Sequence, residues 1–236
     1  MSRLRIFAGP NGSGKSSLYE KLEGKFNLGF YINPDELNKS INNSLKLDLN
    51  NFNIHTKQSE WKKFYSNHGL SNKAVSLPQS IVKNNFIVFN SPLESYDSSI
   101  LSDFLRHKLL ETKETFSFET VFSHPGKLDF MRTANKHDYK CYLYFAAVSA
   151  VEISIDRVRQ RVLEGGHGVP VDKIRSRYDS ALQNLLPAMR LAYRAYLFDN
   201  SQTMKLVAEM TPDKILLIKE KHIPVWIKTY VLDKLQ

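Results

Sequence analysis

A glycine-rich stretch near the start of the chain has the residue types that hold a phosphate chain. Residues 9–16 read GPNGSGKS, which fits the pattern G-x-x-x-x-G-K-[ST] at every fixed position. Glycines let backbone N–H groups curl toward phosphate oxygens, and a helix that begins there adds its positive end. We expect Lys15 to reach the β- and γ-phosphates and the Ser16 hydroxyl to bind Mg²⁺. The cofactors are thus ATP and Mg²⁺, held by Gly9, Asn11, Gly12, Ser13, Gly14, Lys15, Ser16 and Ser17.

Two carboxylates follow or interrupt apolar segments. Asp35 comes just after a short strand-like run in "YINPDELN", where a carboxylate could accept a proton from an acceptor hydroxyl. The alternative is that Asp35 only caps a helix. Glu119 lies inside "FSFETVF", and a buried charge there needs a cation, a metal shell or a hydroxyl donor. The alternative for Glu119 is a strand end that faces water.

A pair of cationic helical patterns surrounds a glycine tip. Arg157 and Arg161 are four residues apart and share one helix face, as do Lys173 and Arg177 on the next helix. This arrangement is typical of a lid that closes over phosphates, with arginines that stabilise the transferred group. The alternative is two solvated amphipathic helices. His167, at the tip, either touches substrate or caps the helix end.

Strands and helices must alternate along the chain to position these residues. We expect strands at 4–8, 30–32, 116–122, 139–148, 195–201, 204–209 and 215–218, and helices at 15–25, 96–113, 125–137, 151–164, 170–193 and 224–235. The segment 42–94 has no clean period, and we interpret it as an insertion or small subdomain with one strand at 86–89. This alternation predicts a single α/β domain over 1–236 with a mainly parallel sheet flanked by helices.

Composition limits the classes of function. The chain has 236 residues, 42% of them hydrophobic, and no run of 18 apolar residues that could span a membrane. The single cysteine, Cys141, cannot form an internal disulfide, so a cytoplasmic location is the default expectation. The net charge is +9, and the arginines gather between 157 and 194 without a run of five like charges. We therefore favour small phosphorylated substrates over nucleic acid as partners.

Together these motifs resemble the zeta-toxin family of P-loop kinases. The resemblance rests on "GPNGSGKS", "NPDE", "FSFETVFS", "RVLEGGHGVPVDKIRSRY" and "LFDNS", in that order, and covers about residues 3–40 and 95–205. It implies a P-loop kinase-like fold with a helical-hairpin lid and transfer of the γ-phosphate of ATP to a hydroxyl. Family members act as toxins of toxin–antitoxin pairs on UDP-N-acetylglucosamine, and a related branch acts on NAD. Any antitoxin would here be a separate chain.

The resemblance also implies roles for individual residues. Asp35 becomes the general base, and Glu119, Thr120 and His167 fall where the acceptor binds. Arg161 and Arg177 become the catalytic arginines beside Lys15, with Arg157 as the alternative phosphate ligand. The segment 42–94 lies outside the resemblance and borders the expected acceptor pocket, so the acceptor stays open.

Three other functions remain in competition. An ATPase switch would need an apolar strand that ends in an Asp beside the Mg²⁺, and only "YLFD", ending at Asp199, comes close. A polynucleotide 5′-kinase is favoured by the basic charge alone, and salt-dependent binding would reveal it. A catalytically idle interaction protein fits poorly with an intact phosphate loop.

Overall fold

The computed structural model describes residues 1–166 and 168–235. The role predicted for His167 therefore lies outside the described residues. The chain divides into two compact units, one made of Met1–Leu28 with Ser117–Gln236 and the other of Gly29–Phe116. The prediction of one domain with an insertion at 42–94 stays a prediction; the second unit includes that whole segment and extends beyond it on both sides.

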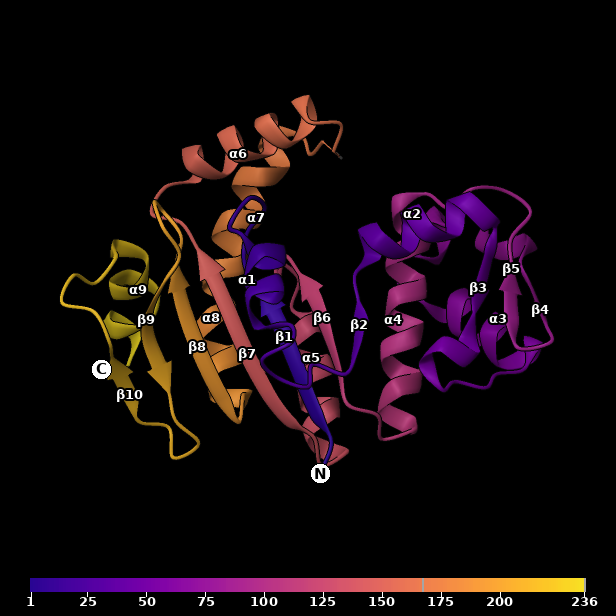
Figure 1. The fold of residues 1–236 in the computed structure, drawn as a ribbon, viewed down its shortest axis with the longest axis horizontal. Coiled ribbons are helices and arrows are strands. Elements are labelled where there is room, and N and C mark those ends of the chain that lie inside the picture. Colours follow the sequence, from indigo (N-terminus) through magenta and orange to yellow (C-terminus); the bar gives the residue numbers. More distant parts are fainter. Residues whose placement is uncertain (167, 236) are drawn as a thin grey trace. The chain divides into compact units, whose positions relative to one another are not determined.

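The first unit is built on a mainly parallel sheet. Its strands follow the order β10-β9-β8-β7-β1-β6, and Figure 1 shows them side by side. The central strands β1, β7 and β8 are parallel, whereas β9 and β10 are antiparallel to their neighbours. The fold class predicted from the alternation of elements is confirmed. The strand bounds are β1 Arg3–Ala8, β6 Phe116–Thr120, β7 Lys140–Ala147, β8 Arg194–Asp199, β9 Lys205–Met210 and β10 Leu216–Ile218.

Helices of the first unit complete its core. Helices α5 and α8 pack on each other and on β7, and α1 packs on β1. Leu4, Ile6 and Cys141 are fully buried in the sheet, and burial raises the pKa of the Cys141 thiol to about 12. The helix bounds are α1 Lys15–Leu22, α5 Gly126–Lys136, α6 Val151–Leu163, α7 Val171–Gln183, α8 Leu185–Leu191 and α9 Val225–Tyr230, followed by the 3₁₀ turn η4 Leu232–Lys234.

The prediction of one long helix at the end of this unit's hairpin is wrong. The expected helix at 170–193 is two helices, α7 and α8, which separate at Asn184. Pro187 explains the break, because its ring lacks an N–H and collides with the carbonyl of the residue four positions earlier in a continuous helix. The Asn184 side chain at the break donates a hydrogen bond to the carbonyl of Phe122 at 3.0 Å.

The second unit has a small sheet and a core of its own. Strands β3, β5 and β4 form a three-stranded antiparallel sheet in that order. The buried Trp61 packs edge-on against Phe104, with ring centroids 4.9 Å apart, and its Nε1 donates to the Ser80 hydroxyl at 2.7 Å. The bounds are β2 Phe30–Ile32, α2 Pro34–Ser44, β3 Lys46–Asp48, α3 Gln58–Asn67, β4 Ile81–Lys83, β5 Phe86–Val88 and α4 Ser95–Glu111, with 3₁₀ turns η1 Leu49–Phe52, η2 Ser71–Lys73 and η3 Leu77–Gln79.

The sequence-based view of segment 42–94 was incomplete. Besides the expected strand, it holds β3, β4 and the helix α3, whose buried Trp61 and Tyr65 are four residues apart on one face. Its many Asn, Ser and Lys residues mask this pattern in the sequence. In the part of the chain that the structure describes, no helix has both the length and the apolar character needed to cross a membrane.

Candidate functional site

The phosphate loop joins the end of β1 to the start of α1. Gly14 caps the helix in the left-handed conformation, with φ 92°, so that Lys15 is the first helical residue. Gly9, with φ 141°, runs so close to β7 that a Cβ there would collide with the carbonyl oxygen of Ala146. The loop thus requires glycine for both its turn and its packing, and its place at the carboxyl end of β1 is where parallel sheets bind ligands.

Three side chains hold the carbonyl groups of this loop. Lys15 Nζ donates to the Pro10 carbonyl at 2.9 Å, and Asn200 Nδ2 donates to the Ser13 carbonyl at 3.0 Å. Arg157 Nη1 donates to the Gly12 carbonyl at 3.3 Å. Carbonyl oxygens repel phosphate, so donors that hold them favour a loop whose N–H groups serve the ligand. The sequence interpretation had not assigned Asn200 a role, although it directly follows β8, the parallel neighbour of β7.

A carboxylate stands beside the predicted Mg²⁺ ligand. Glu119, only 8% exposed on β6, accepts a hydrogen bond from the Ser16 hydroxyl at 3.1 Å. Glu119 therefore faces a hydroxyl donor, which is one of the partners expected for a buried carboxylate in that strand. The next residue, Thr120, has its hydroxyl in a local turn, where it accepts from the N–H of Phe122 at 3.1 Å. The acceptor contacts of Glu119 and Thr120 stay predictions.

Asp35 lies in the other unit, in the first turn of α2. The cap of that helix is Asn33, whose side chain accepts from the Asp35 N–H at 3.0 Å. The capping role that competed with catalysis for Asp35 is thus filled by its neighbour. The Asp35 side chain is exposed. Its action as general base stays a prediction.

The helical hairpin forms from α6 and α7, which pack through Ile155, Val158 and Ile174. Its outer surface also carries an ion pair between the helices, because Arg175 Nη1 lies 2.9 Å from Glu152 Oε1. Such exposed pairs contribute little to stability.

The arginines of the hairpin differ in position. Arg157 reaches the phosphate loop, as described above, although the sequence ranked it behind Arg161 and Arg177. Arg161 is exposed near the tip, where its carbonyl accepts from the Gly166 N–H at 2.8 Å. Arg177 is half-buried on α7. The catalytic roles of Arg161 and Arg177 stay predictions.

Asp199, at the end of β8, is engaged within the chain. Its Oδ1 accepts from the Ser201 hydroxyl at 2.9 Å and from Trp226 Nε1 at 2.9 Å, and its Oδ2 accepts from the Ser201 N–H at 3.2 Å. These bonds fix the loop after β8, and with it Asn200. They give Asp199 a structural role within the first unit.

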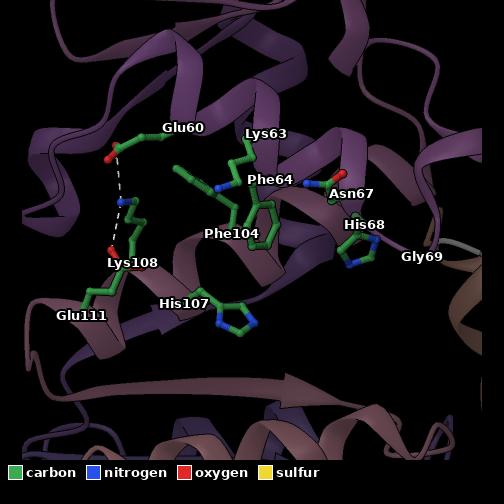
Figure 2. A pocket seen from close by; sticks show the side chains of 10 residues that line it. All are labelled: Glu60, Lys63, Phe64, Asn67, His68, Gly69, Phe104, His107, Lys108 and Glu111. Atoms are coloured by element: carbon green, nitrogen blue, oxygen red, sulfur yellow. Dashed lines mark hydrogen bonds and ion pairs between the residues drawn. The ribbon is translucent and has the colours of Figure 1, made fainter.

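The second unit contains a cavity of about 550 Å³ between α3 and α4 (Figure 2). Several of its charged groups form ion pairs, either with each other or with the neighbouring Asp103. Lys108 Nζ lies 2.9 Å from Glu111 Oε2 and 3.5 Å from Glu60 Oε2, and His68 Nε2 lies 3.1 Å from Asp103 Oδ2. Its lining residues all come from the second unit and include none of the phosphate-loop residues.

Comparisons with known proteins give a likeness of fold. No family model matches the chain. An uncharacterized protein of Haemophilus influenzae is 27% identical over 89 residues, which is 38% of this chain and 64% of that protein. The native AvrRxo1-ORF1:-ORF2 complex contains a chain with a TM-score of 0.61 and 16% identity, over 100% of this chain and 66% of that one.

Two further solved structures are similar. The AvrRxo1-ORF1:-ORF2 crystal structure with ATP matches with a TM-score of 0.58 and 16% identity, over 93% of this chain and 61% of that one. A chain of the PezAT chromosomal toxin–antitoxin system of Streptococcus pneumoniae matches with a TM-score of 0.46 and 12% identity, over 95% of this chain and 75% of that one. This chain thus spans less than two thirds of the AvrRxo1 and Haemophilus proteins. At these identities the comparisons show a shared fold alone, and the chain has the fold of the AvrRxo1-ORF1:-ORF2 chain that it matches.

Proposed function

We propose that this chain is an ATP-dependent phosphotransferase of the P-loop kinase type. The observation that carries the proposal is the grouping of Lys15, Ser16 and Glu119 at the carboxyl ends of β1 and β6. An ammonium group, a hydroxyl and a carboxylate beside a glycine loop are the parts that MgATP requires. ATP in a structure of similar fold supports the same assignment.

The Ser16–Glu119 hydrogen bond has a direct chemical consequence. A serine hydroxyl has one proton and two lone pairs, so a hydroxyl that donates to Glu119 turns its lone pairs toward a cation. Mg²⁺ is a hard cation that prefers oxygen ligands and keeps several waters, one of which a nearby carboxylate can hold. Ser16 would then bind the metal directly, and Glu119 would orient the Ser16 hydroxyl.

The acceptor in this proposal is a hydroxyl on a small nucleotide-linked compound. UDP-N-acetylglucosamine is the first candidate and NAD the second, as the family resemblance implies, and a separate antitoxin chain is the protein partner. Asp35 is the general base that takes the hydroxyl proton. We further propose that segment 42–94 sets the choice of acceptor.

The test is transfer of label from γ-labelled ATP to a panel of acceptors. UDP-N-acetylglucosamine, NAD and an oligonucleotide with a 5′-hydroxyl are incubated separately with the protein and Mg²⁺, and the products are separated by chromatography. Label on a sugar hydroxyl of the first or second compound is the expected result. Label only on the oligonucleotide would identify a polynucleotide kinase, and label only in free phosphate an ATPase; either result contradicts the proposal.

Asp35→Asn sharpens the same experiment. The substituted side chain has nearly the same shape but cannot take up a proton, so transfer should fall about 10²–10⁴-fold while ATP affinity is retained. Glu36→Gln is the matched control, because Glu36 is an exposed carboxylate in the same helical turn. Equal turnover in the Asp35 variant and the wild type would remove Asp35 from the catalytic role.

A further inference from the structure

Another cavity, about 420 Å³ in volume, lies in the first unit, on one face of its sheet. Arg3 and Arg5 of β1 line it together with Tyr142 and Tyr144 of β7 and Tyr196 of β8. Arg3 and Arg5 come from the first half of β1, whereas the phosphate loop follows the end of that strand. Phe26, with 56% of its surface exposed, is one of the apolar residues that complete the lining.

The strand register explains why these side chains share a face. Arg5 pairs with Tyr142, Phe7 with Tyr144, and Tyr144 with Tyr196 in the parallel ladders. The rings of Phe7, Tyr144 and Tyr196 form a continuous stack, with centroids 5.1 and 5.0 Å apart and interplanar angles of 12° and 16°. The alternate residues of β1, such as Leu4 and Ile6, are buried on the opposite face. Both faces of the Tyr144 ring are thus covered, by Phe7 and by Tyr196, and of this stack Tyr144 and Tyr196 line the cavity.

Arg5 is the unusual member of this set. It is only 5% exposed, and neither its Nε nor its Nη1 has a hydrogen-bond partner. Its guanidinium carbon lies 5.6 Å from the centre of the Tyr142 ring, and among the described residues no carboxylate forms an ion pair with it. A cation removed from water needs an opposite charge, because the interior cannot replace its hydration.

An acidic group on this face, Glu209, is already engaged. Glu209 of β9 is the register partner of Tyr196, and it is paired with Arg194 and, at 3.6 Å, with Lys219. No Asp or Glu is among the residues that line the cavity. Burial raises the pKa of Tyr144 and of Tyr196, and the two hydroxyls interact with arginines, that of Tyr144 with Arg5 and that of Tyr196 with Arg194.

We propose that this cavity binds a small organic anion, a carboxylate on a flat apolar body. The carboxylate would pair with Arg5 and accept from tyrosine hydroxyls, and the apolar body would pack against the apolar part of the lining, which comprises Leu22, Phe26, Phe198 and Leu206. The volume falls in the range of about 300–1,000 Å³ that small-molecule sites occupy. This site does not depend on the proposed kinase activity.

The test is calorimetric titration of the full chain with benzoate, and with benzyl alcohol as the neutral analogue of similar shape. Benzoate should bind at least tenfold more tightly than the alcohol. Arg5→Met should lower benzoate affinity at least tenfold, whereas Arg132→Met should not, because Arg132 lies on α5 in an exposed ion pair with Asp129. Lys15→Ala should bind benzoate like the wild type, which separates this site from the phosphate loop.

Three outcomes would overturn the proposal. The first is the absence of benzoate binding at millimolar concentration in a wild-type protein shown to be folded by its thermal transition. The second is equal affinity for benzoate in the wild type and Arg5→Met. The third is binding of an acidic hexapeptide without binding of benzoate, which would make the cavity part of a protein-docking surface instead.

Discussion

The charged groups at the two ends of strand β1 differ in the partners that the chain gives them. At the carboxyl end, the phosphate loop and its neighbours form hydrogen bonds within the chain, from Lys15 to Pro10 and from Ser16 to Glu119. In the first half of the strand, Arg5 is a buried cation with two nitrogens that have no hydrogen-bond partner, whereas the buried side-chain atoms of the loop without a partner, Asn11 Oδ1 and Ser13 Oγ, are neutral. The first end is preorganised by its own residues, whereas the second lacks a counter-charge. Polar groups that a protein leaves buried and unpaired call for an explanation, and a ligand is one.

Lys15→Ala should show the largest effect at the carboxyl end. The change removes the ammonium group that neutralises the transferred phosphate in the proposed reaction, so transfer should fall by about 10³-fold or more. Labelled-ATP assays measure the rate, and circular dichroism checks that the fold is intact. Lys21→Ala is the control, since Lys21 is exposed on the same helix. Full phosphotransfer by the Lys15 variant would refute the phosphate-loop assignment.

The hairpin arginines should divide into two classes. Arg161→Ala and Arg177→Ala should each lower kcat by about 10²-fold and change ATP affinity less than about tenfold, because a late-closing lid meets the charge of the transition state. Arg157→Ala should instead weaken ATP binding, because Arg157 holds the Gly12 carbonyl of the loop. Substitution with lysine should restore only part of the rate.

Single-turnover rates and ATP dissociation constants, measured on the same variants, separate the two classes. Arg159→Ala is the control, because Arg159 is exposed on α6 and forms a surface ion pair with Asp156 at 3.4 Å. If Arg161 and Arg177 have no effect on either quantity, the hairpin is a solvated surface and the lid hypothesis is wrong.

Glu119→Gln should have a smaller effect at the same end. The amide can still accept a hydrogen bond from Ser16 but has lost its charge, so the concentration of Mg²⁺ needed for half-maximal rate should rise about tenfold, in the range typical of outer ligand-shell changes. A Mg²⁺ titration of the transfer rate measures this. An unchanged Mg²⁺ requirement would assign Glu119 to acceptor binding, as the family resemblance implies.

The contrast between the two ends also shows what a sequence can reveal. The phosphate loop is contiguous, and its residues 9–16 form a pattern that needs no tertiary information. The pairing of Glu119 with Ser16 required the adjacency of two strands, although a Glu in an apolar strand was already a signal. The cavity around Arg5 gave no such signal, because its side chains come from strands far apart in the sequence and meet only through the register. By contrast, the break between α7 and α8 could have been predicted from the sequence, because Pro187 lies inside the region expected to be one helix.

The smallest expected effect is on stability, and it compares two arginines of one sheet face. Arg194 is paired with Glu209, whereas Arg5 has no ion-pair partner among the described residues. Arg194→Met should lower the free energy of unfolding by about 1 kcal/mol, because Glu209 is then left mainly to Lys219. Arg5→Met removes a buried cation, and it also removes a hydrogen bond with Tyr144 and a cation–π contact with Tyr142 that is worth about 0.5–1 kcal/mol. Loss of the buried cation stabilises the fold, whereas loss of its contacts destabilises it. The free energy of unfolding of Arg5→Met should therefore match that of the wild type within about 1 kcal/mol or exceed it. Urea unfolding of both variants in buffer without organic anions measures the difference. If Arg5→Met is the less stable of the two, the cation has a favourable partner within the chain, and the contrast between the two ends of β1 fails.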